Sequence, residues 1–177
     1  HKIFFLTRNI KNIKYSNQNV NKILINWENY NSIRSACEDM DIVLHTAGFN
    51  SKNSTQFPSE SLSFSKISSE LILESAINLN VKKIIFFSSI HVYSGELNGG
   101  YSEDINPQNN HPYALSNIAG EQIFIEAFNT KKIETVVLRL SNIYGKPAHI
   151  DSADWSLLFN DVTRQAIKNK AVVLNSN

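Results

Sequence analysis

Tyr113 and Asn117 lie four residues apart in the stretch HPYALSNIAGEQ, whose pattern predicts a helix over residues 112–130. Residues four apart share one face of a helix, so both side chains can line the same site. A tyrosine hydroxyl can exchange a proton with a substrate, but it ionises only near pH 10 unless a cation stabilises the phenolate. Asn117 offers hydrogen bonds and no charge. Tyr113 is therefore either an acid/base group without a cation at this neighbouring position or an aromatic residue packed at a helix start.

Small and polar residues follow three apolar runs of the sequence. The runs near 41–46, 83–89 and 134–140 are continuous, which is typical of parallel strands covered by helices on both faces. In such sheets, ligands bind beyond the carboxyl ends of the strands. The residues of interest at these ends are Thr46, Ala47, Gly48, Ser88, Ser89 and Asn142. Three such segments in order favour one binding site over ordinary turn chemistry.

The elements that must position these residues follow from the alternation of short apolar runs with segments of helical period, which predicts an α/β fold with a parallel sheet. We expect strands near 2–7, 22–26, 41–46, 83–89, 134–140 and 171–174, and helices over 29–38, 58–80, 112–130 and 154–169. The core-facing stripe of the helix over 58–80 is expected to be Leu62, Ile67, Leu71, Ile72, Ala76 and Leu79.

Composition excludes several classes of function. The 177 residues suffice for one domain, and 42% hydrophobic and 19% charged residues are typical of a globular protein. A net charge of +1 does not indicate the strongly basic surface of a nucleic-acid-binding protein. No apolar run is long enough to cross a membrane. The sequence has no Cys/His spacing of a metal site. The single cysteine, Cys37, suits a reducing compartment, so we expect a cytoplasmic location.

Four stretches carry a more specific signal: DIVLHTAG, FFSSIHVYSG, HPYALSNIAGEQ and LRLSNIYGKP. In this order they resemble the motifs D-x-V-x-H-x-A, S-S-x-x-V-Y-G, P-Y-x-x-S-K-x-x-x-E and R-x-x-N-x-Y-G-P. These motifs belong to the extended short-chain dehydrogenase/reductase family, the NAD(P)-dependent epimerases and dehydratases of nucleotide sugars. The resemblance covers nearly the whole chain. It implies a doubly wound, Rossmann-like parallel sheet and hydride transfer between a sugar carbon and nicotinamide.

The resemblance implies a role for each matched position. Tyr113 matches the catalytic tyrosine, and Ser89 matches the serine that hydrogen-bonds the reacting hydroxyl or carbonyl; with Asn117 they form the implied catalytic set. The implied cofactor-binding residues are Arg8, Thr46, Ala47, Gly48, Ser88, Tyr113, Asn117 and Asn142. The cofactor is NAD or NADP, and Arg8 at a strand end without a carboxylate nearby favours NADP.

The sequence departs from the family at several positions. Asn117 replaces a lysine that lowers the pKa of the tyrosine and holds the nicotinamide ribose, and an amide can do only the second. His91 and His111 are candidates for a substitute base, or are simply surface loop histidines. Ser65 stands where the family's long helix usually carries Asn. Ile90 and His91 replace acidic residues of the family's 4,6-dehydratases, so we expect epimerisation or oxidoreduction instead of dehydration.

The family's Gly-rich phosphate loop does not occur in the sequence, and the run near 2–7 resembles the family's second strand. We therefore expect an incomplete sheet that lacks the first strand and helix, in a piece of a longer protein. Residues 1–145 would form a partial NAD(P)-binding domain. Residues 146–177 would begin the substrate-binding lobe.

The resemblance thus implies a nucleotide-sugar epimerase or oxidoreductase. The stretches LHTAGFNS and LRLSNIYG resemble those of a family branch that is found with bacterial surface-polysaccharide genes. A nucleotide sugar is the expected partner, with no nucleic acid or membrane, and family members commonly form homodimers through the helices that match 58–80 and 112–130. Two other roles stay open. Asn117 favours a non-catalytic cofactor-binding relative with a regulatory or scaffolding role, whereas the Ser89–Tyr113 pair disfavours a quinone-reductase-like regulator.

Overall fold

Parallel strands in two groups form the framework of the protein. The computed structural model describes residues 2–8, 20–94, 97, 99–145, 155 and 157–174. β1 (Ile3–Thr7) pairs with β2 (Val20–Leu24), and a second sheet has the order β3 (Ile42–His45), β4 (Lys83–Ser89), β5 (Glu134–Leu140). Both sheets are parallel. Within these residues no backbone hydrogen-bond ladder joins the two sheets. This separation agrees with the expected sheet that lacks its first strand.

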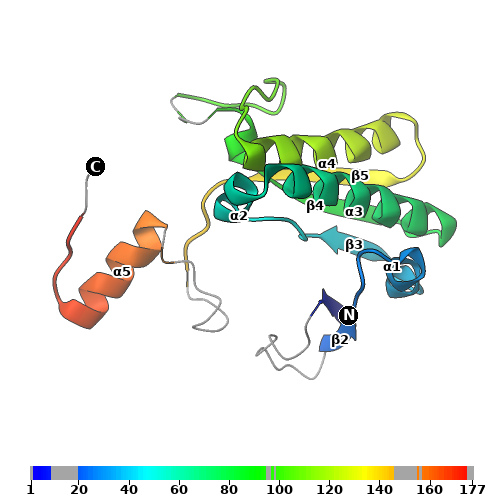
Figure 1. The fold of residues 1–177 in the computed structure, drawn as a ribbon, viewed down its shortest axis with the longest axis horizontal. Helices are drawn as coiled ribbons and strands as arrows, with labels where there is room; N and C mark the ends of the chain where they lie inside the picture. Colours follow the sequence, from blue (N-terminus) through cyan, green and yellow to red (C-terminus); the bar gives the residue numbers. More distant parts are fainter. Residues whose placement is uncertain are drawn as a thin grey trace.

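Five α-helices and one short 3-10 helix are described. They are α1 (Tyr30–Cys37), α2 (Ser51–Gln56), α3 (Pro58–Asn78), η2 (Ile90–Val92), α4 (Pro112–Asn129) and α5 (Leu158–Asn169). Pro58 and Pro112 each occupy the first turn of a long helix, where the missing N–H has no intrahelical partner to lose. Figure 1 shows α3 and α4 side by side across the sheet of β3, β4 and β5, with α5 beyond the ends of these strands.

Several expected boundaries need correction. The second strand begins at Val20 instead of residue 22, and α2 and η2 were not expected from the sequence. The strand expected at 171–174 is wrong, because residues 172–174 form no ladder. Instead, the Gln165 side chain binds the backbone of Val173, accepting its N–H at 2.8 Å and donating to its carbonyl at 3.2 Å. A side chain of α5 thus takes the place of a neighbouring strand.

The buried face of α3 differs from the expected apolar stripe. Ile72 and Ala76 are buried as expected, but Leu62 and Ile67 are 42% and 50% exposed. The remaining buried positions of α3 are serines: Ser61, Ser65, Ser68, Ser69 and Ser75. Small side chains allow close approach of neighbouring elements, and most of these hydroxyls find hydrogen-bond partners inside. The helix therefore packs through serines and turns part of its apolar surface outward.

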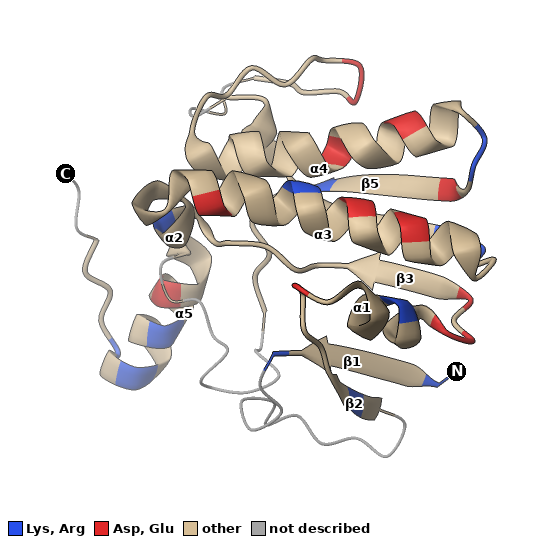
Figure 2. Ribbon diagram, turned by 45° about the vertical axis from the view of Figure 1, so that its right-hand side comes forward, with Lys and Arg blue, Asp and Glu red and all other residues tan. Residues whose placement is uncertain are grey.

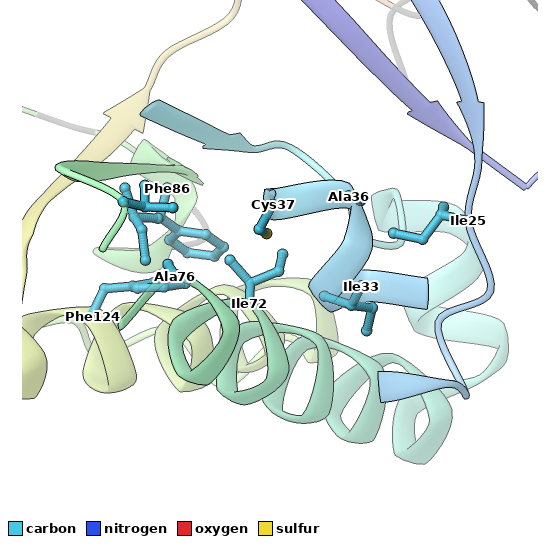
Figure 3. Close-up of a cluster of buried hydrophobic side chains, with 10 residues drawn as sticks. Ile25, Ile33, Ala36, Cys37, Ile72, Ala76, Phe86 and Phe124 are labelled. Atoms are coloured by element: carbon cyan, nitrogen blue, oxygen red, sulfur yellow. The ribbon is translucent and has the colours of Figure 1, made fainter. Parts of the chain in front are cut away.

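The hydrophobic core lies between α1, α3 and the strands. Figure 3 shows Ile33 and Cys37 of α1 near Ile72 of α3, with Phe86 of β4 and Phe124 of α4 at the other end of the cluster. Ile84 is fully buried in β4. By contrast, Ile42 and Leu44 of β3 are 51% and 58% exposed, so the expected cover on both faces is wrong for this strand.

Helix α4 packs tightly against β4 at Gly120. A Cβ atom there would lie 2.6 Å from Cζ of Phe86 and 3.1 Å from Oγ of Ser65. Phe86 is itself buried, so its ring has little room to withdraw. The glycine therefore sets the distance between the helix and the strand that carry Tyr113 and Ser89.

Gly120→Val is expected to lower the free energy of unfolding by about 2 kcal/mol, because overpacking a core costs roughly 1–3 kcal/mol and valine regains little helix propensity. Urea denaturation of the purified variant measures this loss. The matched control is Gly100→Val, since a Cβ at Gly100 meets no heavy atom within 4 Å. Equal stability of the two variants would contradict the close contact.

Charged residues are distributed over the surface. Figure 2 shows only acidic positions on α4, whereas α5 carries both acidic and basic positions. None of the helices in the described part of the chain is long and apolar enough to cross a membrane. Among the described residues, no three His, Cys, Asp or Glu side chains lie close enough together to hold a metal ion.

Candidate active site

A pocket of about 220 Å³ lies at the carboxyl ends of β3 and β4, against the start of α4. Four parts of the chain line it: the segment Thr46–Asn50 after β3, Ser65 of α3, Phe86 and Phe87 of β4, and Tyr113, Ser116 and Asn117 of α4. Of the site residues expected from the sequence, Thr46, Ala47, Gly48, Tyr113 and Asn117 are thus brought together.

The segment after β3 presents backbone to the pocket. Ala47 and Gly48 have small side chains, and a Cβ built on Gly48 would meet no heavy atom within 4 Å. Asn50 ends the segment by capping α2, its side-chain oxygen accepting the N–H of Asn53 at 2.9 Å. The open space beside Gly48 lets a ligand approach the backbone closely.

The position of Tyr113 is fixed by the start of α4. His111 caps this helix, with its Nδ1 accepting the N–H of Tyr113 at 3.2 Å. The other ring nitrogen of His111 lies 3.2 Å from the hydroxyl of Thr55 on α2. Asn109 braces the same turn, donating to the carbonyl of His91 at 2.7 Å and accepting the N–H of His111 at 2.9 Å. Both nitrogens of His111 are engaged, which disfavours it as a substitute base.

The side chain of Asn117 turns back onto its own helix. Its Nδ2 donates to the carbonyl oxygen of Tyr113 at 2.7 Å, the hydrogen bond that short polar side chains often make four residues back. Asn117 still lines the pocket and is half-buried. Its amide oxygen has no partner among the described hydrogen bonds of the side chain, so it can accept a bond from a ligand hydroxyl.

Ser65 supports the floor of the pocket. Its hydroxyl is buried and donates to the carbonyl oxygen of Ser116 at 2.6 Å. This bond ties α3 to the same turn of α4 that carries Tyr113. The serine therefore braces the helix, although its side chain is shorter than the asparagine expected at this position.

Four expected site residues lie outside the pocket lining. Ser89 is buried at the end of β4, and its hydroxyl accepts the N–H of His91 at 3.3 Å, which starts η2. Ser88 is buried and bonded to Glu121. Asn142 is exposed after β5, and Arg8 is exposed after β1. The functional roles of all these residues stay predictions.

Sequence reasoning did not single out Phe86, Phe87 and Ser116 as lining residues. Phe86 and Phe87 directly precede Ser88 on β4. Their position near the carboxyl end of a strand could have indicated that they line the pocket. Ser116 matches the serine of the motif P-Y-x-x-S-K, so its place in that motif was the available signal. The polar partners behind the pocket, the buried Glu121 and the partly buried Arg139, were likewise not expected to form a pair.

The family model described as "NAD dependent epimerase/dehydratase family" matches residues 1–177, the whole chain. The protein belongs to this family. The expected resemblance to NAD(P)-dependent epimerases and dehydratases is thereby confirmed.

Similar proteins include human dTDP-D-glucose 4,6-dehydratase, 30% identical over 109 residues that cover 61% of this chain and 31% of the relative. Among solved structures, UDP-N-acetylglucosamine 4-epimerase of Methanobrevibacter ruminantium M1, in complex with UDP-N-acetylmuramic acid, has a TM-score of 0.82. It is 20% identical, and the match covers 99% of this chain and 58% of that one. dTDP-glucose 4,6-dehydratase of Streptomyces venezuelae, with NAD bound, has a TM-score of 0.77 at 16% identity, covering 95% and 53%.

These structural likenesses establish the fold of this family member. The Rossmann-like parallel architecture expected from the sequence is confirmed. The chain spans a little over half of these two solved chains, and its match spans about a third of the human relative. The fold therefore corresponds to one part of the larger relatives.

Proposed function

We propose that this protein is an NAD(P)-dependent nucleotide-sugar epimerase or oxidoreductase, acting in the biosynthesis of surface polysaccharide in the cytoplasm. The observation that carries the proposal is the pocket at the strand ends, which Tyr113 and Asn117 of α4 line together with Thr46, Ala47 and Gly48. The family match over the whole chain supports the same reaction class. The resemblance of LHTAGFNS and LRLSNIYG to polysaccharide-associated members supports the pathway.

In the proposed reaction, a bound nicotinamide supplies or accepts the hydride. The Tyr113 hydroxyl takes the proton from the sugar hydroxyl being oxidised and returns it when the carbonyl is reduced. The Ser89 hydroxyl donates a hydrogen bond to the same sugar oxygen. Ala47 and Gly48 leave room for the cofactor to lie on the backbone, and the Asn117 amide oxygen accepts a bond from a ribose hydroxyl.

The residues after Ser89 favour hydride exchange without elimination of water. Ile90 and His91 provide no carboxyl group in the position where elimination needs a proton donor and acceptor. The His91 backbone is also engaged, its N–H with Ser89 and its carbonyl with Asn109. Epimerisation or simple oxidoreduction is therefore preferred over dehydration. Arg8, exposed after β1, supports NADP because its guanidinium can pair with a 2′-phosphate.

We also propose that the protein forms a homodimer. Apolar side chains on the outer faces of α3 and α4 are exposed, among them Leu62, Ile67, Ile125 and Phe128. Burying such a surface against a second copy gains the free energy of removing apolar area from water. Residues 146–177 are proposed to begin a substrate-binding lobe, which agrees with α5 having no buried residue.

The deciding experiment uses the complete natural protein with NAD and NADP, titrated separately. Change of nicotinamide absorbance with a panel of UDP-, GDP- and dTDP-sugars, or interconversion of epimers followed by chromatography, supports the enzyme. Tight cofactor binding without turnover of any sugar contradicts it. That result would favour the second candidate, a non-catalytic cofactor-binding protein, for which the neutral Asn117 beside Tyr113 is the supporting observation.

Asn117→Lys is expected to raise turnover about tenfold, because a cation one helical turn from Tyr113 stabilises the phenolate form of the acid/base group. Cofactor affinity should stay equal or increase. Steady-state kinetics and cofactor titration measure both effects. Gln122→Lys, an exposed amide replaced on the same helix, is the matched control. A large loss of cofactor affinity in Asn117→Lys alone would mean that residue 117 does not face the cofactor.

A further inference from the structure

A buried polar network lies behind the pocket and is not part of its lining. Glu121 of α4 is 1% exposed, and its carboxylate receives bonds from two other elements. Arg139 of β5 donates through Nε to Oε1 at 3.1 Å and through Nη2 to Oε2 at 2.8 Å. Ser88 of β4 donates to Oε1 at 2.5 Å. The carboxylate is thus fully engaged by one charged and one neutral donor.

Arg139 extends the network to the long connection between β4 and α4. Its Nη1 donates to the hydroxyl of Tyr93 at 2.8 Å and to the carbonyl oxygens of Glu103 at 3.3 Å and Ile105 at 3.5 Å. The guanidinium also lies over the Tyr93 ring, 4.8 Å from its centroid. The bond with Glu121 holds the pKa of Arg139 above its usual range, so the charge is permanent.

The network joins the elements on which the proposed chemistry depends. Ser88 directly precedes Ser89, and Ser88 is the register partner of Arg139 in the β4–β5 ladder. Glu121 lies eight residues after Tyr113, about two turns along α4. One carboxylate therefore links the strand end that carries the serine, the helix that carries the tyrosine and, through Arg139, the residues Tyr93, Glu103 and Ile105.

Stability alone does not explain such a pair. Removing two opposite charges from water offsets much of their attraction, and well-packed apolar residues often serve stability as well. A bidentate pair with a third donor does, however, fix the relative position of the groups that it joins. The arrangement is thus better suited to holding geometry than to adding stability.

We propose that Glu121 and Arg139 are positioning residues: together with Ser88 they hold the Ser89 strand end in register with Tyr113, and they fasten the β4–α4 segment to the same carboxylate at Tyr93, Glu103 and Ile105. This proposal rests on the proposed function for its catalytic consequence. Its structural part, the fastening of the segment, stands on the contacts alone.

The first test measures amide hydrogen exchange in the natural protein. The reporter amides are Ile105, bonded to the carbonyl of Ser102, and Gln108 and Asn109, both bonded to the carbonyl of Val92. Arg139→Lys keeps a cation for Glu121 but loses the planar guanidinium, whose N–H groups also donate to Tyr93, Glu103 and Ile105. Exchange of the Ile105 amide is expected to become at least tenfold faster. Glu121→Gln should act likewise, and Glu126→Gln, an exposed glutamate on the same helix, is the matched control.

The second test measures turnover. Ser88→Ala removes only the bond between β4 and Glu121, so kcat is expected to fall about tenfold with KM and the exchange of Ile105 unchanged. Ser88→Thr keeps the hydroxyl and should restore kcat. A kcat of Ser88→Ala equal to that of the natural protein, or unchanged Ile105 exchange in Arg139→Lys, overturns the proposal. If the natural protein converts no nucleotide sugar, the proposed function fails, and the exchange experiment alone still decides the positioning role.

Discussion

Tyr113→Phe is expected to lower turnover of the nucleotide sugar about 100- to 10,000-fold, the range that a positioned acid/base group contributes. The substitution removes only the hydroxyl that exchanges the proton and leaves the aromatic ring at the helix start. Cofactor affinity should change little, because the proposed contacts with the dinucleotide come mainly from the Thr46–Gly48 backbone and Asn117. The fall should therefore appear in kcat and not in the dissociation constant of the cofactor.

Single-turnover absorbance of the nicotinamide, followed after mixing with sugar, measures the effect on the chemical step. Tyr30→Phe is the matched control, since it deletes a hydroxyl that accepts a hydrogen bond from Asn78 at 3.2 Å and lies outside the pocket lining. If Tyr113→Phe and Tyr30→Phe both turn over at the natural rate, Tyr113 is only a packed aromatic residue and the proposed mechanism is wrong.

Acidification from pH 6.5 to pH 4 is expected to remove about 3 kcal/mol of folding free energy through His45 alone. Burial lowers the pKa of His45 to about 4, against an ordinary value of 6.5. The imidazole is 2% exposed and packs against the rings of Trp27, Phe86 and Phe124. The unfolded chain therefore takes up the proton before the folded protein does. The stabilising contribution is complete above pH 6.5 and is lost as the pH falls toward 4.

Urea denaturation at several pH values between 4 and 7 measures this dependence. His45→Phe keeps an aromatic ring in the cluster and removes the titrating group, so its stability should fall about 3 kcal/mol less over the same interval. His111→Asn, which replaces an exposed histidine with another capping residue, is the control and should keep the natural slope. Parallel slopes for His45→Phe and the natural protein would show that His45 titrates normally.

Much of the fold followed from local patterns. The limits of β4 and β5 agree with the expected 83–89 and 134–140, because continuous apolar runs bounded by polar residues have few alternatives in a parallel sheet. Pro58 and Pro112 marked the starts of α3 and α4 for an equally local reason, their fixed backbone angle. The placement of Thr46–Gly48 and Tyr113 at one pocket followed from the rule that parallel strand ends share an edge.

Other features depended on neighbours that are distant in the chain. The buried face of α3 is serine-rich because α4 and the sheet lie close to it, which no periodicity of apolar residues could indicate. The Asn117 amide nitrogen donates a hydrogen bond to the Tyr113 carbonyl oxygen of its own helix. Fewer of its hydrogen-bonding groups are therefore available to a ligand than its position suggested.

By itself, then, the sequence determined the family, the limits of β4 and β5 and the residues at the carboxyl ends of the strands, because short-range backbone preferences and motif spacing act over a few positions. Only the tertiary structure decided that Glu121 joins Ser88 and Arg139, partners 33 and 18 residues away. Hydrogen bonds and packing between separate elements depend on distances that the linear order of residues does not contain.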